Sequence, residues 1–290
     1  MHSSSGYVEV DGGQLFYQTY GSGYPLIVVH GGPGLDHSYL FPQMLELAKQ
    51  YHLIFYDQRG SGRSLDACSE PQYLTIEQFV KDLEAVCVAL KLDKYALVGH
   101  SWGGLLVLNY ALNYSDYISH IILLNTLGAD RQSYDAYAQE ASRRVVCVQE
   151  EIAAFFSEEL FCALGETEME TLYRTLFSIY FNNQKDVALL SLFQPKASAV
   201  SGYKVMQYME YAYLAHAHYD LFPALQFLKV PTLLVHGEQD IVPVSTAQKI
   251  KDTLPYAQIV RLDECGHFCY VEKPIETFTA ISEFISNYPK

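Results

Sequence analysis

The sequence predicts an α/β fold in which a mostly parallel central sheet carries helices on both faces and a helical segment is inserted between two of the strands. Three observations support this prediction. Short, wholly apolar runs recur along the chain, as they do in strands that are covered on both faces. Stretches with helical spacing lie between these runs, so that strand and helix alternate. The alternation then breaks between about residues 130 and 225, where helical patterns dominate.

The first expected element is a hairpin, and the core strands follow it. The segment between residues 7–10 and 15–20 begins with Asp-Gly-Gly, a sequence typical of a tight hairpin turn. Helices are expected over 76–90 and 105–112 and at the end of the chain, where apolar residues from Ile275 to Ile285 share one face. The wholly apolar runs that we expect to be core strands are 26–29, 53–56, 95–98, 121–124, 232–235 and 259–262.

The helical segment divides the chain into two expected domains. Residues 1–129 and 226–290 form a core domain, and residues 130–225 form a helical cap domain. The cap segment contains 13 acidic and 7 basic residues, so it is acidic like the chain as a whole.

The composition excludes several classes of partner. The 290 residues include 19 Lys and Arg against 33 Asp and Glu, a formal net charge of -14. Without a basic footprint the chain is not expected to bind nucleic acid, whereas a cationic ligand such as a free amine is tolerated or mildly attracted. No apolar run approaches the roughly 18 residues that a spanning helix needs, so no membrane partner is expected.

The cysteines and the N-terminal residues indicate a cytoplasmic protein. The first residues contain no basic segment followed by an apolar stretch, and the six cysteines are scattered without a C-x-x-C pair, so we expect reduced thiols. Cys265 and Cys269 bracket His267, but this spacing matches no usual zinc pattern. We therefore expect neither a metal nor a cofactor.

The most informative stretch is residues 99–104, with the sequence Gly-His-Ser-Trp-Gly-Gly, between the strand 95–98 and the helix 105–112. G-x-S-x-G in this context is a nucleophile elbow, in which the serine sits on a sharp turn above a helix N-terminus. Ser101 is the candidate nucleophile. The alternative is a glycine-rich turn that cradles a phosphate, but the dinucleotide-binding spacing and a P-loop lysine are both missing.

A nucleophilic serine requires a base and an orienting acid in the chain order Ser, Asp, His. Asp240 follows the strand 232–235, and His267 follows the strand 259–262, so both lie at the sheet edge that carries Ser101. We take Asp240 and His267 as the remaining members of a catalytic triad. Asp263 and Asp220 remain alternatives for the acid.

The loop after the first core strand supplies the expected oxyanion hole. Residues 30–34 have the sequence His-Gly-Gly-Pro-Gly, and glycines allow the backbone to approach a substrate closely. The expected donors are the backbone N–H groups of Gly32 and of Trp102, the residue after the nucleophile. An ordinary glycine-rich turn is the alternative interpretation.

Over nearly its whole length the chain resembles the α/β-hydrolase superfamily, and more narrowly the proline iminopeptidase family and the related tricorn-interacting aminopeptidase. The resemblance rests on residues 30–34, 57–64 and 99–104. It implies a helical cap over the site, a structural role for 57–64, and Glu210 as an acidic anchor for the substrate's free amine. The implied substrate is a short peptide or amino-acid amide with an apolar or prolyl N-terminal residue.

The sequence departs from the proline iminopeptidase family at two places, and two other functions remain as alternatives. Some relatives carry a second acid just after the catalytic aspartate, where this chain has Ile241. The sequence pattern typical of the cap in the bacterial proline-specific enzymes is not clearly matched. Proline preference is therefore open. A carboxylesterase or acylglycerol lipase would use the same triad, and a non-catalytic binding module would use the fold without the chemistry. The sequence does not specify the oligomeric state.

Overall fold

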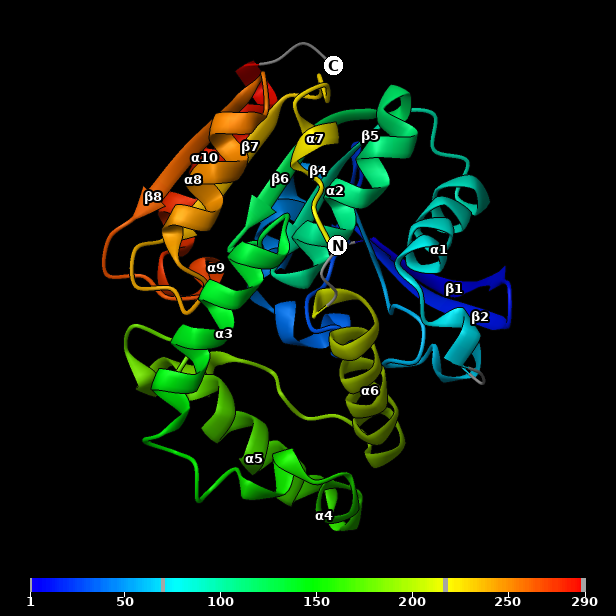
Figure 1. Ribbon diagram of the computed structural model, residues 1–290. Coiled ribbons are helices and arrows are strands. Elements are labelled where there is room, and N and C mark those ends of the chain that lie inside the picture. Colours follow the sequence, from blue (N-terminus) through cyan, green and yellow to red (C-terminus); the bar gives the residue numbers. More distant parts are fainter. Residues whose placement is uncertain (1, 69–70, 216–218, 288–290) are drawn as a thin grey trace.

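The computed structural model describes residues 2–68, 71–215 and 219–287, and it is organised around one eight-stranded sheet (Figure 1). The strand order is β1-β2-β4-β3-β5-β6-β7-β8; β1 with β2 and β2 with β4 are antiparallel, and the other neighbouring pairs are parallel. The predicted α/β fold with a mostly parallel sheet is confirmed. The strands are β1 (Ser3–Val10), β2 (Gly13–Tyr20), β3 (Tyr24–Val29), β4 (Tyr51–Tyr56), β5 (Tyr95–His100), β6 (Ile118–Leu124), β7 (Thr232–Gly237) and β8 (Ala257–Leu262).

Helices cover both faces of the sheet, which explains the continuous apolarity of the strands. On β3, Ile27 and Val29 join the hydrophobic cluster on one face, whereas Leu26 and Val28 join the cluster on the other. The first cluster contains residues of α1 (Ile76–Ala89), α2 (Trp102–Tyr114) and α8 (Val244–Thr253). The second contains residues of the 3₁₀ segment Gln43–Lys49, α9 (Cys269–Glu272) and α10 (Pro274–Asn287).

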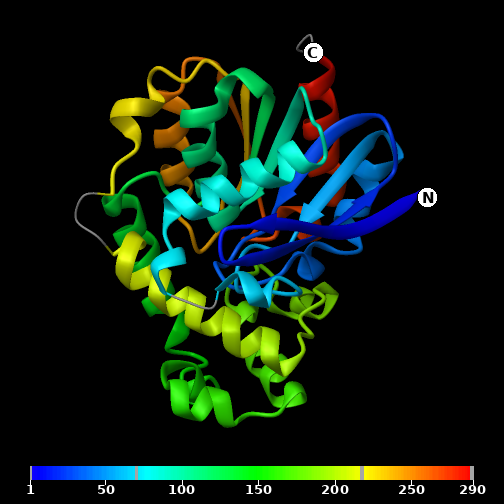
Figure 2. The ribbon, with the colours of Figure 1, turned by 90° about the vertical axis from the view of Figure 1, so that its right-hand side faces the viewer.

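A group of helices lies to one side of the sheet, as Figures 1 and 2 both show. These helices belong to the segment for which the sequence predicted helical structure, and they follow β6 in the chain. They are α3 (Arg131–Val145), α4 (Glu158–Ala163), α5 (Glu166–Ser178) and α6 (Lys196–Met209). We call this group the helical layer.

After the helical layer, the chain returns to the start of α3. The Arg131 N–H donates to the Tyr219 carbonyl at 2.9 Å, and the Leu221 N–H donates to the Ala129 carbonyl at 2.8 Å. The short helix α7 (Phe222–Leu225) then packs against α2 and α8. The last residues of the predicted cap segment therefore lie on the core, and the division into core and cap domains stays a prediction.

In the three described stretches, no helix is both long and apolar enough to cross a membrane. The cysteines recorded as free thiols are Cys87, Cys147, Cys162, Cys265 and Cys269.

Candidate active site

Ser101 occupies the sharp turn between β5 and α2. Its backbone has φ 56° and ψ -122°, a conformation that residues with side chains rarely adopt and that is found mostly at functional sites. Two glycines leave room for the turn: a Cβ at Gly103 would overlap the Val29 carbonyl oxygen, and a Cβ at Gly99 would lie 2.5 Å from the Gly103 carbonyl oxygen. Although Ser101 is the N-cap residue of α2, its hydroxyl makes no capping hydrogen bond. The geometry therefore matches the strained turn that the sequence motif predicts.

His267 and Asp240 contact each other directly. The His267 Nδ1 lies 2.8 Å from Asp240 Oδ1, and this carboxylate also accepts hydrogen bonds from the Val242 N–H at 3.0 Å and from Asn125 Nδ2 at 2.8 Å. Burial is the largest influence on Asp240 and raises its pKa, but His267, His236 and the hydrogen bonds together outweigh burial, so that the pKa is lowered. Because an ionised carboxylate only accepts hydrogen bonds, the His267 proton lies on Nδ1. The Nε2 atom is then left as a base.

Asn125 is a residue of this site that the sequence analysis missed. It follows β6 in left-handed backbone, with φ 48°, and its Nδ2 donates to Asp240 and, at 2.9 Å, to the Gly266 carbonyl. Its Oδ1 accepts a hydrogen bond from the Cys269 N–H at 3.3 Å. Asn125 therefore holds the acid and the loop that contains His267 in one arrangement. A polar residue directly after a core strand, at the edge that carries Ser101, is the signal that could have identified it.

The two alternative acids make other contacts. Asp220 accepts a hydrogen bond from the Phe222 N–H at 3.0 Å, at the start of α7. Asp263 accepts from the Glu264 N–H at 2.9 Å and from the Gln239 side chain at 3.4 Å, and it is exposed. Of the three candidates, Asp240 is the one that is hydrogen-bonded to the His267 ring.

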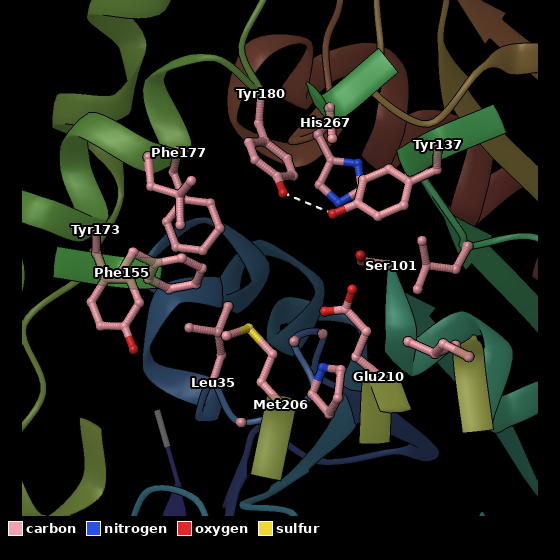
Figure 3. A pocket seen from close by; sticks show the side chains of 18 of the residues that line it. Leu35, Ser101, Tyr137, Phe155, Tyr173, Phe177, Tyr180, Met206, Glu210 and His267 are labelled. Carbon is pink, nitrogen blue, oxygen red and sulfur yellow. Dashed lines mark hydrogen bonds between the residues drawn. The ribbon is translucent and has the colours of Figure 1, made fainter. Parts of the chain in front are cut away.

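Ser101 and His267 line one cavity of about 320 Å³, which Figure 3 shows from close by. The helical layer and the segments that join its helices contribute much of the wall, and the wall is mainly apolar and aromatic. Beside the His267 ring, the hydroxyls of Tyr137 and Tyr180 are hydrogen-bonded at 2.9 Å, and the Tyr180 ring centroid lies 5.4 Å from that of His267. Other members of the wall are Leu35, Phe155, Tyr173, Phe177 and Met206.

Glu210 is the one carboxylate among the described residues that line this cavity. It directly follows α6 and begins a π-helical turn, Glu210–Leu214. In Figure 3 its carboxylate points into the cavity on the side of Ser101. Burial, followed by the charge of Glu210, raises the pKa of the Tyr134 hydroxyl, which also lines the cavity. Glu210 itself is exposed, and a carboxylate at the wall of an apolar cavity is chemically suited to pair with a cation.

The two expected oxyanion donors belong to segments that adjoin Ser101. Gly32 lines the cavity with φ 121°, a backbone conformation that favours glycine, and a Cβ at the preceding Gly31 would lie 3.1 Å from the Ser101 Cβ. Trp102 is the first residue of α2, so its N–H has no carbonyl partner within the helix. Gly32 and Trp102 thus lie in segments that adjoin the candidate nucleophile, and their role as oxyanion donors stays a prediction.

The sequence pattern of the family described as alpha/beta hydrolase fold matches residues 24–274. The chain belongs to the α/β-hydrolase fold family. The predicted resemblance is confirmed at this level, and curated relatives carry it further. The proline iminopeptidase of Lactobacillus helveticus (strain DPC 4571) is 29% identical over an alignment of 275 positions, which covers 91% of this hydrolase and 90% of the relative. The proline iminopeptidase of Saccharolobus solfataricus is 28% identical over an alignment of 295 positions, which covers 97% of this chain and 91% of the relative.

Solved structures share the fold of this α/β hydrolase. The proline iminopeptidase of Mycobacterium smegmatis matches with a TM-score of 0.72 and 22% identity, covering 98% of each chain. An esterase from Rhodococcus sp. ECU1013 matches with a TM-score of 0.73 and 21% identity, covering 100% of each chain. A peptidase and an esterase thus match equally well, so the likeness shows the fold alone.

The 57–64 stretch has a structural role in this α/β hydrolase, as expected. The Arg59 guanidinium forms a bidentate pair with the Asp82 carboxylate of α1, at 2.6 and 2.7 Å, and both side chains are buried. Asp57 lies 2.6 Å from His37 Nδ1 and accepts a hydrogen bond from the Arg63 N–H at 2.9 Å. These contacts fix the loop after β4.

Within the described residues, no group of three His, Cys, Asp or Glu side chains could hold a metal ion.

Proposed function

We propose that this α/β hydrolase is a serine aminopeptidase that releases an apolar N-terminal residue, proline included, from short peptides or amino-acid amides. The observation that carries the proposal is that Glu210, Ser101 and His267 line the same apolar cavity. A nucleophile and a base beside a single carboxylate suit a substrate with a free ammonium next to its scissile carbonyl. The relatives named proline iminopeptidase support the same activity.

In the proposed mechanism Ser101 Oγ attacks the substrate carbonyl carbon while His267 Nε2 takes the hydroxyl proton. The tetrahedral oxyanion accepts hydrogen bonds from the Gly32 and Trp102 N–H groups. His267 then gives the proton to the leaving amine, and the C–N bond breaks to leave an acyl-enzyme. A water molecule, deprotonated by His267, attacks the ester carbon, and the released serine oxygen takes the proton back. Asp240 stabilises the imidazolium that forms in each half of the reaction.

Glu210 would select for substrates with a free amine. A hydrogen bond between a carboxylate and an ammonium contributes about 1.5–3 kcal/mol, which corresponds to about a 10–100-fold preference for the charged substrate. The place of the second acid of some relatives is taken by Ile241, a buried apolar residue. A single carboxylate supports amine recognition without a requirement for proline.

The test is a panel of aminoacyl-naphthylamides with free and acetylated N-termini, assayed beside p-nitrophenyl acetate. We expect acetylation to abolish turnover of the naphthylamides. Glu210→Gln should lose about 10–100-fold of kcat/KM on the free-amine substrates and retain its rate on the nitrophenyl ester. Glu159→Gln, an exposed acid of α4, is the matched control and should behave as wild type. Equal turnover of free and acetylated substrates would exclude an aminopeptidase.

The aromatic wall of the cavity favours a second candidate, a carboxylesterase or acylglycerol lipase that uses the same nucleophile. Phe155, Tyr173 and Phe177 would contact an acyl chain as readily as an apolar side chain. In that case short-chain and medium-chain nitrophenyl esters would be turned over at high kcat/KM, acylation of the amine would be immaterial, and Glu210→Gln would leave all rates unchanged.

A further inference from the structure

A buried hydrogen-bonded chain joins the loop after β3 to the loop that carries His267. The Gly31 N–H donates to the Tyr39 hydroxyl at 2.6 Å, and this hydroxyl lies 2.8 Å from His100 Nδ1. The His100 Nε2 in turn lies 2.9 Å from the His267 carbonyl oxygen. Tyr39 and His100 are each 2% exposed, so water does not compete for these bonds.

The direction of every hydrogen bond in this chain is determined by its ends. A carbonyl oxygen can only accept, so the proton of His100 lies on Nε2 and points at His267. His100 Nδ1 is then an acceptor, so the Tyr39 hydroxyl donates to it and accepts from Gly31. Burial, followed by the proximity of His267, lowers the pKa of His100 to about 3, which keeps this ring in the required neutral form.

A second buried connection joins the same loop to the residue after the nucleophile. The Gln58 Nε2 donates to the His30 carbonyl at 2.6 Å, and its Oε1 accepts from the indole N–H of Trp102 at 2.9 Å. The His30 ring accepts from the Gln58 N–H at 3.0 Å through Nε2, so its Nδ1 donates to the Gly31 carbonyl at 2.8 Å. Both backbone groups of Gly31 are therefore held by side chains.

We propose that Tyr39 and Gln58 are positioning residues that fix the two oxyanion donors, Gly32 and Trp102, relative to each other and to His267. This inference rests on the proposed serine hydrolase function. Gly32 directly follows the doubly held Gly31, and Trp102 is held through its own side chain. The two connections use different partners, so each can be cut without cutting the other.

Stability alone does not account for these buried polar side chains, because a well-packed apolar core of the same shape would be about as stable. A positioning role does account for them. Tyr39, Gln58 and His100 are all nearly inaccessible to solvent, and their hydrogen bonds end on the three segments that form the proposed catalytic centre. A displacement of about 1 Å at such a centre lowers the rate by up to about 100-fold. The hydrogen bonds of Tyr39, Gln58 and His100 prevent that displacement.

The first test is Tyr39→Phe, which removes one hydroxyl and keeps the ring. With p-nitrophenyl acetate, which has no amine, we expect kcat to fall about 10–100-fold and KM to change less than about twofold. The affinity for phenylboronic acid, whose boron accepts an electron pair from Ser101 Oγ and places an oxygen in the oxyanion hole, should fall in parallel. The matched control is Tyr95→Phe, which removes a buried hydroxyl hydrogen-bonded to Tyr110 at the far end of the strand that precedes Ser101.

The control separates positioning from stability. Tyr95→Phe should lower the midpoint of urea unfolding about as much as Tyr39→Phe and leave kcat unchanged. Retention of wild-type kcat and boronate affinity by Tyr39→Phe would overturn the inference. Loss of kcat in both variants in proportion to their stability would overturn it as well.

The second test is Gln58→Met, which keeps the side-chain length and removes both hydrogen bonds. Trp102 is the single tryptophan of the chain, so one indole N–H resonance in a ¹⁵N-labelled sample reports on this connection. We expect this resonance to shift upfield in Gln58→Met, together with a 10–100-fold loss of kcat, and to keep its position in Tyr95→Phe. An unchanged resonance or an unchanged kcat would contradict the proposed role of Gln58.

Failure of the proposed function has a different outcome from failure of this inference. If the wild-type protein neither hydrolyses p-nitrophenyl acetate nor reacts with a fluorophosphonate, the serine hydrolase proposal fails, and the positioning role fails with it. If the wild type reacts and both variants match it, only the positioning role fails.

Discussion

Gly202 of α6 and Gly34 of the loop after β3 touch through their backbones, and this contact leads to a sharp prediction. A Cβ at Gly202 would overlap the Gly34 carbonyl oxygen, and a Cβ at Gly34 would overlap the Gly202 carbonyl oxygen. Gly202 has the ordinary backbone of a helix, whereas Gly34 has φ 93°. Gly202→Ala therefore adds one methyl group without backbone strain. The added group presses α6 against the loop that contains the proposed oxyanion donor.

Two opposing effects set the magnitude for Gly202→Ala. Replacing glycine by alanine inside a helix stabilises it by about 1 kcal/mol. Inserting a methyl group into a close backbone contact costs about 1–3 kcal/mol, so the net effect on the free energy of unfolding lies between zero and a loss of about 2 kcal/mol. Relief of the overlap moves the loop by on the order of 1 Å, which is enough to lower kcat about 10–100-fold.

The assay combines urea unfolding with the kinetics of p-nitrophenyl acetate hydrolysis. Ser201→Ala, at the neighbouring position of α6, is the matched control, because it favours the helix without adding atoms near Gly34. We expect Gly202→Ala to lose activity at equal or lower stability and Ser201→Ala to retain both. If Gly202→Ala gains about 1 kcal/mol of stability and keeps its activity within twofold, the backbone contact does not position the loop.

Three further predictions follow from the described contacts. Asn125→Ala leaves acceptors on Asp240 and on its neighbouring loop without a donor, so kcat/KM should fall about 10-fold and the urea midpoint should drop; an unchanged kcat/KM would show that Asn125 does not support the acid. Burial lowers the pKa of His30 to about 4 and of His100 to about 3, so below about pH 6.5 the unfolded chain binds protons that the folded chain does not. The free energy of unfolding should therefore fall by up to about 1.4 kcal/mol per pH unit for each ring down to about pH 4. A urea-unfolding midpoint that stays constant from pH 7 to 4 would contradict this. Phe155→Ala removes an aromatic ring from the cavity wall, so kcat/KM should fall about 10-fold for phenylalanyl-naphthylamide and little for alanyl-naphthylamide. Equal losses on the two substrates would place Phe155 outside the substrate pocket.

The strands and the elbow were predictable because their signals are local. A run such as Ile121 to Leu124 is apolar at every position because its side chains alternate between two covered faces, and the structure confirms this for β6. Ser101 could be located because glycines on both sides of it are required by the turn itself. These patterns depend on neighbours in sequence, so one sequence is sufficient to detect them.

The polar connections were not predictable because their partners are far apart in the chain. Asn125 is 115 residues from Asp240, and Tyr39 is 61 residues from His100, so no spacing links the members of either pair. Glu210 was selected by resemblance alone, since a π-helical turn at the end of α6 has no sequence signal that identifies which side chain enters the cavity. Contacts of this kind follow from the assembled fold.

Covalent labelling shows whether Ser101 is a nucleophile activated by His267. The folded protein should react with a fluorophosphonate at a stoichiometry of about one, and peptide mapping should place the label on Ser101. Ser101→Ala should not react, and His267→Ala should react far more slowly. A folded wild-type protein that remains unlabelled, or that carries the label on another residue, would contradict the proposed active site.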